Sequence, residues 1–218
     1  MSEKNKIKDY SLYLVFSQDC ALGKSALEIT KEAILGGIDI LQMREKNKSK
    51  DQLLNLGREL RALCKKNNVT FIVNDDPYLV KEIDADGLHL GQEDILKYPL
   101  ENTRNIIGKN KIIGISTHSI EQFKIANTRE DFDYLSYGPI FPTLTKDYFI
   151  GTKDIKEVLE ITKKPVVFIG GINLSNLDEI LDKGAKIVAL IRGIMQAKDI
   201  VSTTKIFKEK INQKRTPK

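Results

Sequence analysis

Eight apolar runs typical of β-strands alternate with helical segments along this chain, and this alternation constrains the fold more than any other feature. The runs span Leu12–Phe16, Ile38–Met43, Thr70–Val73, Gly87–Leu90, Ile112–Ile115, Tyr134–Tyr137, Val166–Ile169 and Ile187–Ile191. The segments that we predict to be helical span Ala21–Leu35, Asp51–Lys66, Pro77–Glu82, Ile120–Asn127, Ile155–Ile161, Leu174–Leu181 and Ile200–Ile211, and the stretch Ile95–Lys109 is poorly patterned. A strand–helix unit repeated eight times is typical of a closed (β/α)8 barrel, the TIM barrel.

A single domain over residues 1–218 fits both the length and the even composition of the chain. The chain contains no low-complexity linker, and 218 residues suit one α/β barrel. The competing fold is a doubly wound open sheet. Its G-x-G-x-x-G fingerprint is absent after the first apolar run, so we favour the barrel.

The composition argues against several classes of partner. The formal net charge is +5, and much of it comes from lysines near the ends of the chain and on helical faces, which a solvated surface explains better than a nucleic-acid patch. No apolar run is long enough to cross a membrane. Cys20 and Cys64 form no C-x-x-C motif, and the N-terminus has no signal-peptide core. We therefore expect a cytoplasmic protein without nucleic-acid or membrane partners.

Gln42, Arg44 and Lys46 follow the second apolar run at alternate positions. Side chains at i, i+2 and i+4 of an extended chain share one face, so these three are expected to project together. An amide and two cations on one inward face are costly to desolvate unless they meet an anion. The pattern predicts a seat for a diphosphate or polyphosphate.

Two acidic residues follow adjacent strands, Asp75 after the third and Asp94 after the fourth. Neighbouring carboxylates repel each other unless a cation lies between them or one takes a proton. Oxygen ligands without His or Cys suit Mg²⁺. The alternative is that Asp75 and Asp76 cap the helix that begins near Pro77. The capping role suits Asp76, whereas for Asp75 we favour the metal.

Further polar residues follow the remaining strands, where the chemistry of such barrels is found. Ser116 and Lys146 could join Arg44 and Lys46 in neutralising a departing diphosphate, although a single lysine in a loop is usually surface. Gly170 and Gly171 permit close approach of a phosphate to the backbone, or make a tight turn. Arg192, Thr143 and Thr145 could contact the same anion.

No general-base pair or activated nucleophile stands out among these residues. His89 lies within an apolar strand and fits a core residue, whereas His118 fits either an acid or base at the rim or a residue at the start of a helix. A site rich in charge compensation and poor in acid–base groups suggests that a diphosphate leaves and a second, phosphorylated substrate attacks.

Several motifs together resemble the thiamine-phosphate synthase family. They occur in the family's order over nearly the whole chain, and they are Gln42–Lys46, Val73–Asp75, Gly87–Asp94, Gly114–Ser116, Gly138–Lys146 and Ile169–Ile172. The resemblance implies a (β/α)8 barrel and a transferase of a pyrimidinylmethyl group. It would join 4-amino-2-methyl-5-hydroxymethylpyrimidine diphosphate to 4-methyl-5-(2-phosphoethyl)thiazole, or its carboxylated form, with Mg²⁺-assisted loss of diphosphate.

The resemblance also implies roles for individual residues. The pyrimidine diphosphate would contact Gln42, Met43, Arg44, Glu45, Lys46, Asn74, Ser116 and Lys146, among which Arg44, Lys46, Ser116 and Lys146 would be catalytic. The thiazole phosphate would contact Thr143, Leu144, Thr145, Gly171, Ile191 and Arg192. Mg²⁺ would be held by Asp75 and Asp94. The sequence leaves the oligomeric state open, a homodimer included.

Two departures from the family pattern leave alternatives open. Arg192 stands where the family usually has Ser, and Phe16–Asp19 replaces the usual Thr-Asp after the first strand. A thiazole tautomerase of the same superfamily would use a histidine like His118 but typically lacks the second acid, so Asp94 favours the synthase. The third hypothesis is a non-catalytic sensor of thiamine precursors, and Arg192 is the only residue that favours it.

Overall fold

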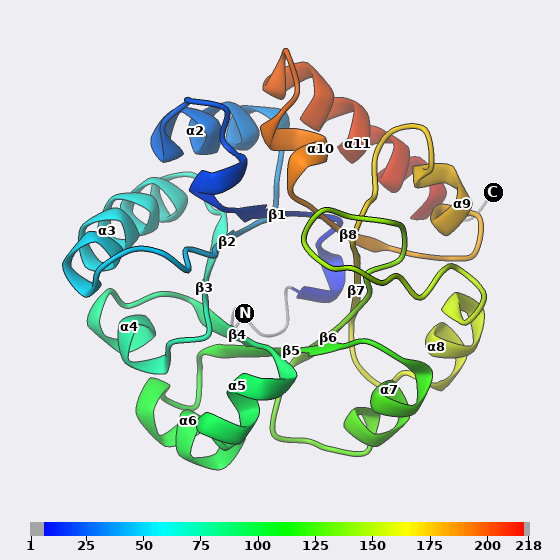
Figure 1. Cartoon of the computed structure of the whole chain (residues 1–218), viewed down its shortest axis with the longest axis horizontal. Helices are drawn as coiled ribbons and strands as arrows, with labels where there is room; N and C mark the ends of the chain where they lie inside the picture. Colours follow the sequence, from blue (N-terminus) through cyan, green and yellow to red (C-terminus); the bar gives the residue numbers. More distant parts are fainter. Residues whose placement is uncertain (1–6, 216–218) are drawn as a thin grey trace.

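A computed structural model describes residues 7–215, and its centre is a closed barrel of parallel strands in the order β1 to β8 (Figure 1). The strands are β1 Leu12–Phe16, β2 Ile40–Met43, β3 Thr70–Asn74, β4 Gly87–Leu90, β5 Ile112–Thr117, β6 Tyr134–Tyr137, β7 Val166–Ile169 and β8 Ile187–Leu190. β1 pairs with both β2 and β8, which closes the barrel, with Tyr13 opposite Ile40 on one side and Ala189 on the other. The prediction of a (β/α)8 barrel is confirmed.

Helices surround the barrel on its outside (Figure 1). They are α2 Ala26–Gly36, α3 Lys50–Lys66, α4 Pro77–Glu82, α5 Gln92–Lys97, α6 Leu100–Ile107, α7 Ile120–Asn127, α8 Ile155–Ile161, α9 Leu177–Leu181, α10 Arg192–Met195 and α11 Ile200–Arg215, together with the short 3₁₀ turns η1 Ile7–Asp9 and η2 Gln18–Cys20. The poorly patterned stretch after β4 therefore contains two helices. None of the helices within residues 7–215 is both long and apolar enough to cross a bilayer.

Local capping chemistry explains where α2 begins and ends. We predicted a start at Ala21, but Leu22 and Gly23 have φ angles of 48° and 86°, which form a turn. The helix begins at Ala26 because Ser25 and Glu28 form a reciprocal capping box, in which each side chain accepts the other residue's backbone N–H. Gly37 ends the helix with a φ of 98°, a conformation that costs glycine little.

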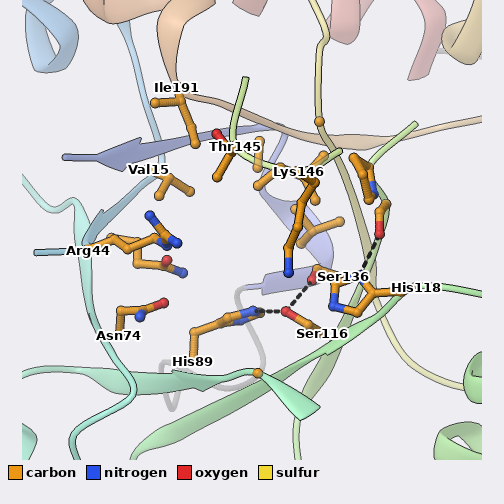
Figure 2. A pocket seen from close by; sticks show the side chains of 18 of the residues that line it. Val15, Arg44, Asn74, His89, Ser116, His118, Ser136, Thr145, Lys146 and Ile191 are labelled. Carbon is orange, nitrogen blue, oxygen red and sulfur yellow. Dashed lines mark hydrogen bonds between the residues drawn. The ribbon is translucent and has the colours of Figure 1, made fainter. Parts of the chain in front are cut away.

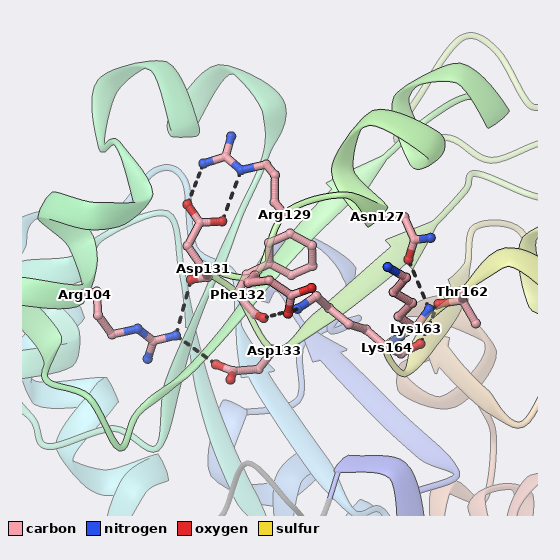
Figure 3. A network of polar contacts seen from close by, with 10 residues as sticks. Arg104, Asn127, Arg129, Asp131, Phe132, Asp133, Thr162, Lys163 and Lys164 are labelled. Atoms are coloured by element: carbon pink, nitrogen blue, oxygen red, sulfur yellow. Dashed lines mark hydrogen bonds and ion pairs between the residues drawn. The ribbon is translucent and has the colours of Figure 1, made fainter.

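The second strand begins at Ile40, two residues later than predicted, and the carboxylate of Asp39, just before it, bonds to β1 and α11. This carboxylate accepts the backbone N–H groups of Ser11 and Leu12 at 2.8 and 3.0 Å, and Lys208 donates to it at 2.6 Å. Asp86 and Asp133 stand in the equivalent places before β4 and β6, where they accept the N–H groups of Phe71 and Ile113. Figure 3 shows Asp133 with its partner Arg104.

The strand side chains form two apolar layers. One set lies between the barrel and the helices, and it includes Leu41, Met43 and Phe71. The other fills the barrel, and it comprises Ile7, Tyr13, Val15, Ile40, Ile72, Ile112, Tyr134, Val167, Ile187 and Ala189. Because side chains alternate along a strand, the inner set continues toward the carboxyl ends through Gln42, His89 and Ser116, which brings these polar groups to one end of the barrel.

Candidate active site

A cavity of about 380 Å³ opens at the carboxyl ends of the strands. It is lined by residues from every strand or from the loop that follows it, including Tyr13, Gln42, Arg44, Lys46, Asn74, Asp75, His89, Asp94, Ser116, His118, Tyr134, Ser136, Thr143, Thr145, Lys146, Ile169, Gly170 and Ile191. Figure 2 shows Arg44 and Lys146 reaching toward the centre of this cavity from opposite sides. The predicted cations, acids and hydroxyl groups therefore share one space.

The cations come from two places on the rim. Gln42, Arg44 and Lys46 all line the cavity, which confirms that they project together. The backbone N–H of Arg44 donates to Phe16 at 2.9 Å, so the β-ladder and its alternation continue past the end of β2. Lys146 belongs to the loop after β6, and its Nζ lies 5.9 Å from the centre of the Tyr148 ring. Within residues 7–215 none of these cations forms an ion pair.

Asp75 and Asp94 approach each other at the same rim. Asp75 has a φ of 65°, and its backbone N–H donates to the carbonyl of His89 at 2.9 Å. Asp94 lies in the first turn of α5, where its Oδ2 accepts the N–H of Gly91 at 3.1 Å. Burial and the neighbouring Asp94 together raise the pKa of Asp75 to about 7, although Lys46 and Arg44 oppose that shift. The pair is an electrostatically unfavourable arrangement that a cation or a proton relieves.

Asp76 has the separate role that the sequence suggested as the alternative. Its Oδ1 accepts the backbone N–H groups of Tyr78 and Leu79 at 2.9 and 3.1 Å, and Pro77 occupies the first turn of α4. Asp76 therefore caps a helix and does not line the cavity.

A chain of hydrogen bonds forms the floor of the cavity. Gln42 Nε2 lies 2.7 Å from the Tyr13 hydroxyl, which lies 3.0 Å from the Tyr134 hydroxyl. The Tyr134 hydroxyl lies 2.8 Å from His89 Nδ1, and His89 Nε2 lies 2.9 Å from Ser116 Oγ. His89 is buried with both ring nitrogens bonded, as expected of a core residue, yet it also lines the cavity. Burial lowers the pKa of His89 to about 4, so its ring is neutral at physiological pH.

His118 lines the cavity from the end of β5 (Figure 2). Its Nδ1 lies 2.7 Å from the carbonyl oxygen of Gly138, which can only accept, so Nδ1 carries a hydrogen. The other ring nitrogen is then free of a hydrogen in the neutral ring. This arrangement gives the rim one basic nitrogen of the kind that proton transfer requires.

A second pocket of about 220 Å³ adjoins the first at the ends of β7 and β8. Its lining includes Thr143, Leu144, Gly171, Ile191 and Arg192 from the predicted phosphate set, whereas Thr145 lines the larger cavity. Gly171 has a φ of 66°, and a Cβ there would lie 2.4 Å from the carbonyl oxygen of Pro142. Only glycine fits that place, because the backbone of Phe141 and Pro142 in the loop after β6 lies directly against it.

Arg192 connects the two pockets. It is the first residue of α10, and its Nη1 donates to Thr145 Oγ1 at 3.4 Å. Within residues 7–215 its guanidinium has no carboxylate partner. A guanidinium in this position can grip an anion in the second pocket in a bidentate fashion.

Two of the residues that the resemblance assigns to the pyrimidine diphosphate do not line the cavity. Met43 points outward into the layer between the barrel and the helices. The carboxylate of Glu45 turns to the backbone N–H of Gln18, which donates to it at 2.6 Å, and burial raises the pKa of Glu45. Contact of these side chains with a substrate stays a prediction.

The sequence interpretation missed Tyr13, Tyr134 and Ser136, which line the cavity from inside their strands. A signal for them exists in the sequence. They are polar or amphipathic residues at inward positions of the strands, on the same alternation that places Gln42 and Ser116 inside. The predicted site residues lie mostly at or after the ends of the strands, whereas these three lie within strands.

Comparisons with known proteins agree with this geometry. The sequence model of the family described as thiamine monophosphate synthase matches residues 12–194. The chain belongs to this family. It is 38% identical to the thiamine-phosphate synthase of Halalkalibacterium halodurans over 211 residues, which cover 95% of this chain and 98% of that protein. It is also 38% identical to the thiamine-phosphate synthase of Persephonella marina over 202 residues, which cover 92% and 95%.

A solved structure shows the same architecture. The thiamine phosphate pyrophosphorylase from Pyrococcus furiosus superposes with a TM-score of 0.85 at 33% identity, over 98% of this chain and 99% of that one. Family membership supports thiamine-phosphate synthase activity and places the chain among the transferases of thiamine biosynthesis.

Proposed function

We propose that the protein condenses 4-amino-2-methyl-5-hydroxymethylpyrimidine diphosphate with 4-methyl-5-(2-phosphoethyl)thiazole to give thiamine phosphate and diphosphate. With the carboxylated form of the thiazole the same products form and CO₂ is also released. The C–O bond between the pyrimidinylmethyl carbon and the diphosphate breaks, and a C–N bond to the thiazole nitrogen forms. The electron pair of the broken bond leaves with the diphosphate. The reaction therefore needs charge compensation at the leaving group more than it needs an acid or a base.

The observation that carries the proposal is the gathering of unpaired charge at one mouth of the barrel. Arg44, Lys46 and Lys146 line the same cavity as Asp75 and Asp94, and a glycine-lined pocket adjoins it. Arg44 is half-buried without a carboxylate partner, which is costly unless an anion binds there, and the exposed Lys46 and Lys146 can reach the same anion. Two adjacent anion sites suit a diphosphate and a phosphate bound next to each other.

In the proposed reaction, the leaving diphosphate is held by three kinds of donor. Arg44 offers a planar fork for two phosphate oxygens, whereas Lys46 and Lys146 act as mobile point charges. Ser116 adds a neutral donor, and Asn74 lies at the same rim. Donors that are already in place stabilise charge as it develops on the departing oxygen, because they need little reorganisation.

Asp75 and Asp94 suit Mg²⁺ as the accompanying cation. Among residues 7–215 no group of three or more His, Cys, Asp or Glu side chains could hold a metal ion, and Asp75 and Asp94 are the two carboxylates proposed to hold one here. That donor set fits Mg²⁺, which usually keeps several waters and takes phosphate oxygens from a substrate. When bound, the ion would neutralise charge on the diphosphate, and it would relieve the repulsion from Asp94 that adds to burial in raising the pKa of Asp75.

The second pocket is the proposed site of the thiazole phosphate. Gly171, Thr143 and Arg192 border this space, where the hydroxyl and the guanidinium can donate to a phosphate. Because the two pockets share Ile191 and Thr143 in their linings, a thiazole held there would face the reacting carbon of the pyrimidine. Closeness and orientation of the two rings would supply much of the rate enhancement.

One observation favours a second candidate, a thiazole tautomerase. His118 has the free ring nitrogen that such a proton transfer needs, and it lines the same cavity. The tautomerase reading gives no role to Asp94 beside Asp75, nor to Arg44 and Lys46. The condensation uses all of these residues, and we prefer it for that reason.

The test is to incubate the purified protein with both heterocycles, with and without Mg²⁺, and to measure thiamine phosphate and diphosphate. We expect stoichiometric formation of both products, dependent on the metal. Isomerisation of the thiazole alone would support the tautomerase. Tight binding of either heterocycle without any conversion would mean that the protein is a sensor.

A further inference from the structure

The hydrogen-bonded chain on the floor of the cavity has a direction. It connects Gln42, Tyr13, Tyr134, His89 and Ser116 through four contacts of 2.7–3.0 Å. All of these residues except Ser116 are buried, so water does not compete for their polar groups. Each hydroxyl has one hydrogen to give, so the role of one member constrains the role of the next.

The direction starts at Gln42, whose amide nitrogen can only donate. Tyr13 therefore accepts from Gln42 and gives its own hydrogen to Tyr134, its other partner. Tyr134 in turn gives its hydrogen to His89 Nδ1. Because Nδ1 accepts, the neutral imidazole carries its hydrogen on Nε2 and donates it to Ser116 Oγ.

Ser116 is the open end of this chain. Its oxygen accepts from His89 at 2.9 Å, and Ser136 also donates to it at 3.4 Å. The hydrogen of the Ser116 hydroxyl is then left for the cavity, in the direction where Arg44 and Lys146 also point (Figure 2). With the opposite order, His89 would accept from Ser116, and the hydroxyl hydrogen would turn away from the cavity.

We propose that His89, held in its Nε2–H tautomer by Tyr134, is a positioning residue that presents the hydroxyl of Ser116 as a donor to the substrate's leaving anion. This inference rests on the proposed function for the identity of that anion. The direction of the hydrogen bonds rests only on the five residues of the network. Ser116 touches the diphosphate, and His89 acts through it. The arrangement excludes Ser116 as a base in the reaction, because its hydrogen serves as the donor.

The hydrogen-bond order can be measured without substrate. The chain has two histidines, so the ¹⁵N resonances of His89 are assigned by comparison with a His89→Gln variant. In the wild-type protein we expect Nδ1 of His89 to show the chemical shift of an unprotonated ring nitrogen and Nε2 that of a protonated one. The reverse pattern would overturn the proposal whatever reaction the protein catalyses.

The functional half is tested by the choice of replacement at His89. Gln keeps an N–H donor that can reach Ser116, whereas Leu fills similar space without one. We expect His89→Leu to lower kcat about 100-fold with little change in KM, as for the loss of one donor to a developing oxyanion, and His89→Gln to recover most of that loss. Equal losses in both variants, with native unfolding temperatures, would mean that kcat does not depend on an N–H donor at this position, which would overturn the positioning role.

A double-mutant cycle separates positioning from packing. In a Ser116→Ala background the hydroxyl is gone, so His89→Leu is expected to cause no further fall in kcat. Additive losses would contradict action through Ser116. Tyr134→Phe is expected to lower kcat several-fold and to change the His89 tautomer pattern. The matched control is Tyr137→Phe, because the Tyr137 hydroxyl donates to Asp154, which is not part of this hydrogen-bond network, and we expect this variant to do neither. If Tyr134→Phe behaves like Tyr137→Phe, Tyr134 does not hold the ring.

The two proposals fail in different ways. If the wild-type protein forms no thiamine phosphate, the proposed function fails, and the ¹⁵N measurement still decides the hydrogen-bond order. If the wild-type protein forms product and the His89 and Ser116 variants act independently, the function stands and the positioning role falls.

Discussion

At the amino ends of the strands, three aspartates stand immediately before β2, β4 and β6, and each has both a backbone and a cationic partner. Asp39 accepts from Ser11 and is paired with Lys208 of α11. Asp86 accepts from Phe71 and is paired with Arg61 of α3 at 2.9 Å. Asp133 accepts from Ile113 and is paired with Arg104 of α6 at 3.0 Å (Figure 3). At this end of the barrel, ion pairs connect residues of the outer helices to the residues that precede the strands.

At the carboxyl ends, the cations that line the cavity form no ion pair with any carboxylate of residues 7–215. Arg44, Lys46 and Lys146 line a cavity without an ion pair, and Asp75 faces a like charge on Asp94. The same residue types therefore do opposite things at the two ends of one barrel. Satisfied charge is typical of structure, and charge left unsatisfied at a cost in stability is typical of a site awaiting a ligand.

The largest effect that this contrast predicts is the loss of turnover in Asp94→Asn. The substitution keeps the oxygen that caps α5 at Gly91 but removes one of two carboxylates proposed to hold Mg²⁺. Metal charge compensation contributes several kcal/mol to such reactions, so we expect kcat/KM to fall by about 1,000-fold or more. Steady-state kinetics over a range of Mg²⁺ concentrations measures the loss. Near-normal activity in this variant would remove Asp94 from the metal site.

The complementary change at the other end is Asp133→Asn. It leaves the guanidinium of Arg104 partly buried without its carboxylate, so we expect the free energy of unfolding to fall by about 2 kcal/mol. Well below the unfolding transition kcat/KM should equal that of the wild type, since Asp133 lies at the end of the barrel away from the cavity. Urea denaturation and kinetics on the same samples give both values. A rate loss without a stability loss would contradict the division of roles between the two ends.

The sequence revealed the rim far better than the amino end. Alternation of side chains correctly placed Gln42, Arg44 and Lys46 on one face, and the position of Asp75 and Lys146 after strands correctly brought them to one cavity. These inferences need only local geometry and the barrel fold. Asp39, by contrast, is paired with Lys208, which is 169 residues away along the chain, and no local pattern indicates that partner.

Side-chain alternation also accounts for residues whose positions in the structure differ from the predicted site. The alternation that turns Gln42 inward also turns Met43 outward, where the structure places it. The same rule would have singled out Tyr13 and Tyr134 as inward polar groups. The partners of His89, in contrast, depend on how the strands pair across the barrel, which the sequence of a single strand does not contain.

A smaller effect is expected from Arg192→Ser, which tests one unpaired charge at the second pocket. Loss of a charged donor to a phosphate should raise KM for the thiazole phosphate about 10-fold and leave kcat within about twofold. Initial rates with the thiazole varied at saturating pyrimidine diphosphate give the two constants. Thr145→Val serves as a control, because it removes the hydroxyl that Arg192 contacts and keeps the guanidinium. A lower KM in Arg192→Ser would show that the arginine obstructs the pocket.

The smallest expected effect is a pH dependence of the metal-free fold that arises from Asp75. Its pKa is raised to about 7 in the folded protein, compared with about 3.9 for an unfolded aspartate, so the folded state binds the proton more tightly. Stability from this group is therefore fully present below about pH 4 and is lost as the pH rises through 7. Allowing for partial solvent exposure, we expect a loss on the order of 1 kcal/mol between pH 5.5 and 8 in EDTA.

Denaturation of the wild type and of Asp94→Asn at both pH values measures this loss of stability. The loss should shrink in Asp94→Asn, which removes the like charge, and Mg²⁺ at pH 8 should restore stability in the wild type alone. An equal pH dependence in the two proteins would mean that the two carboxylates do not repel each other, and the contrast between the two ends of the barrel would lose its acidic half.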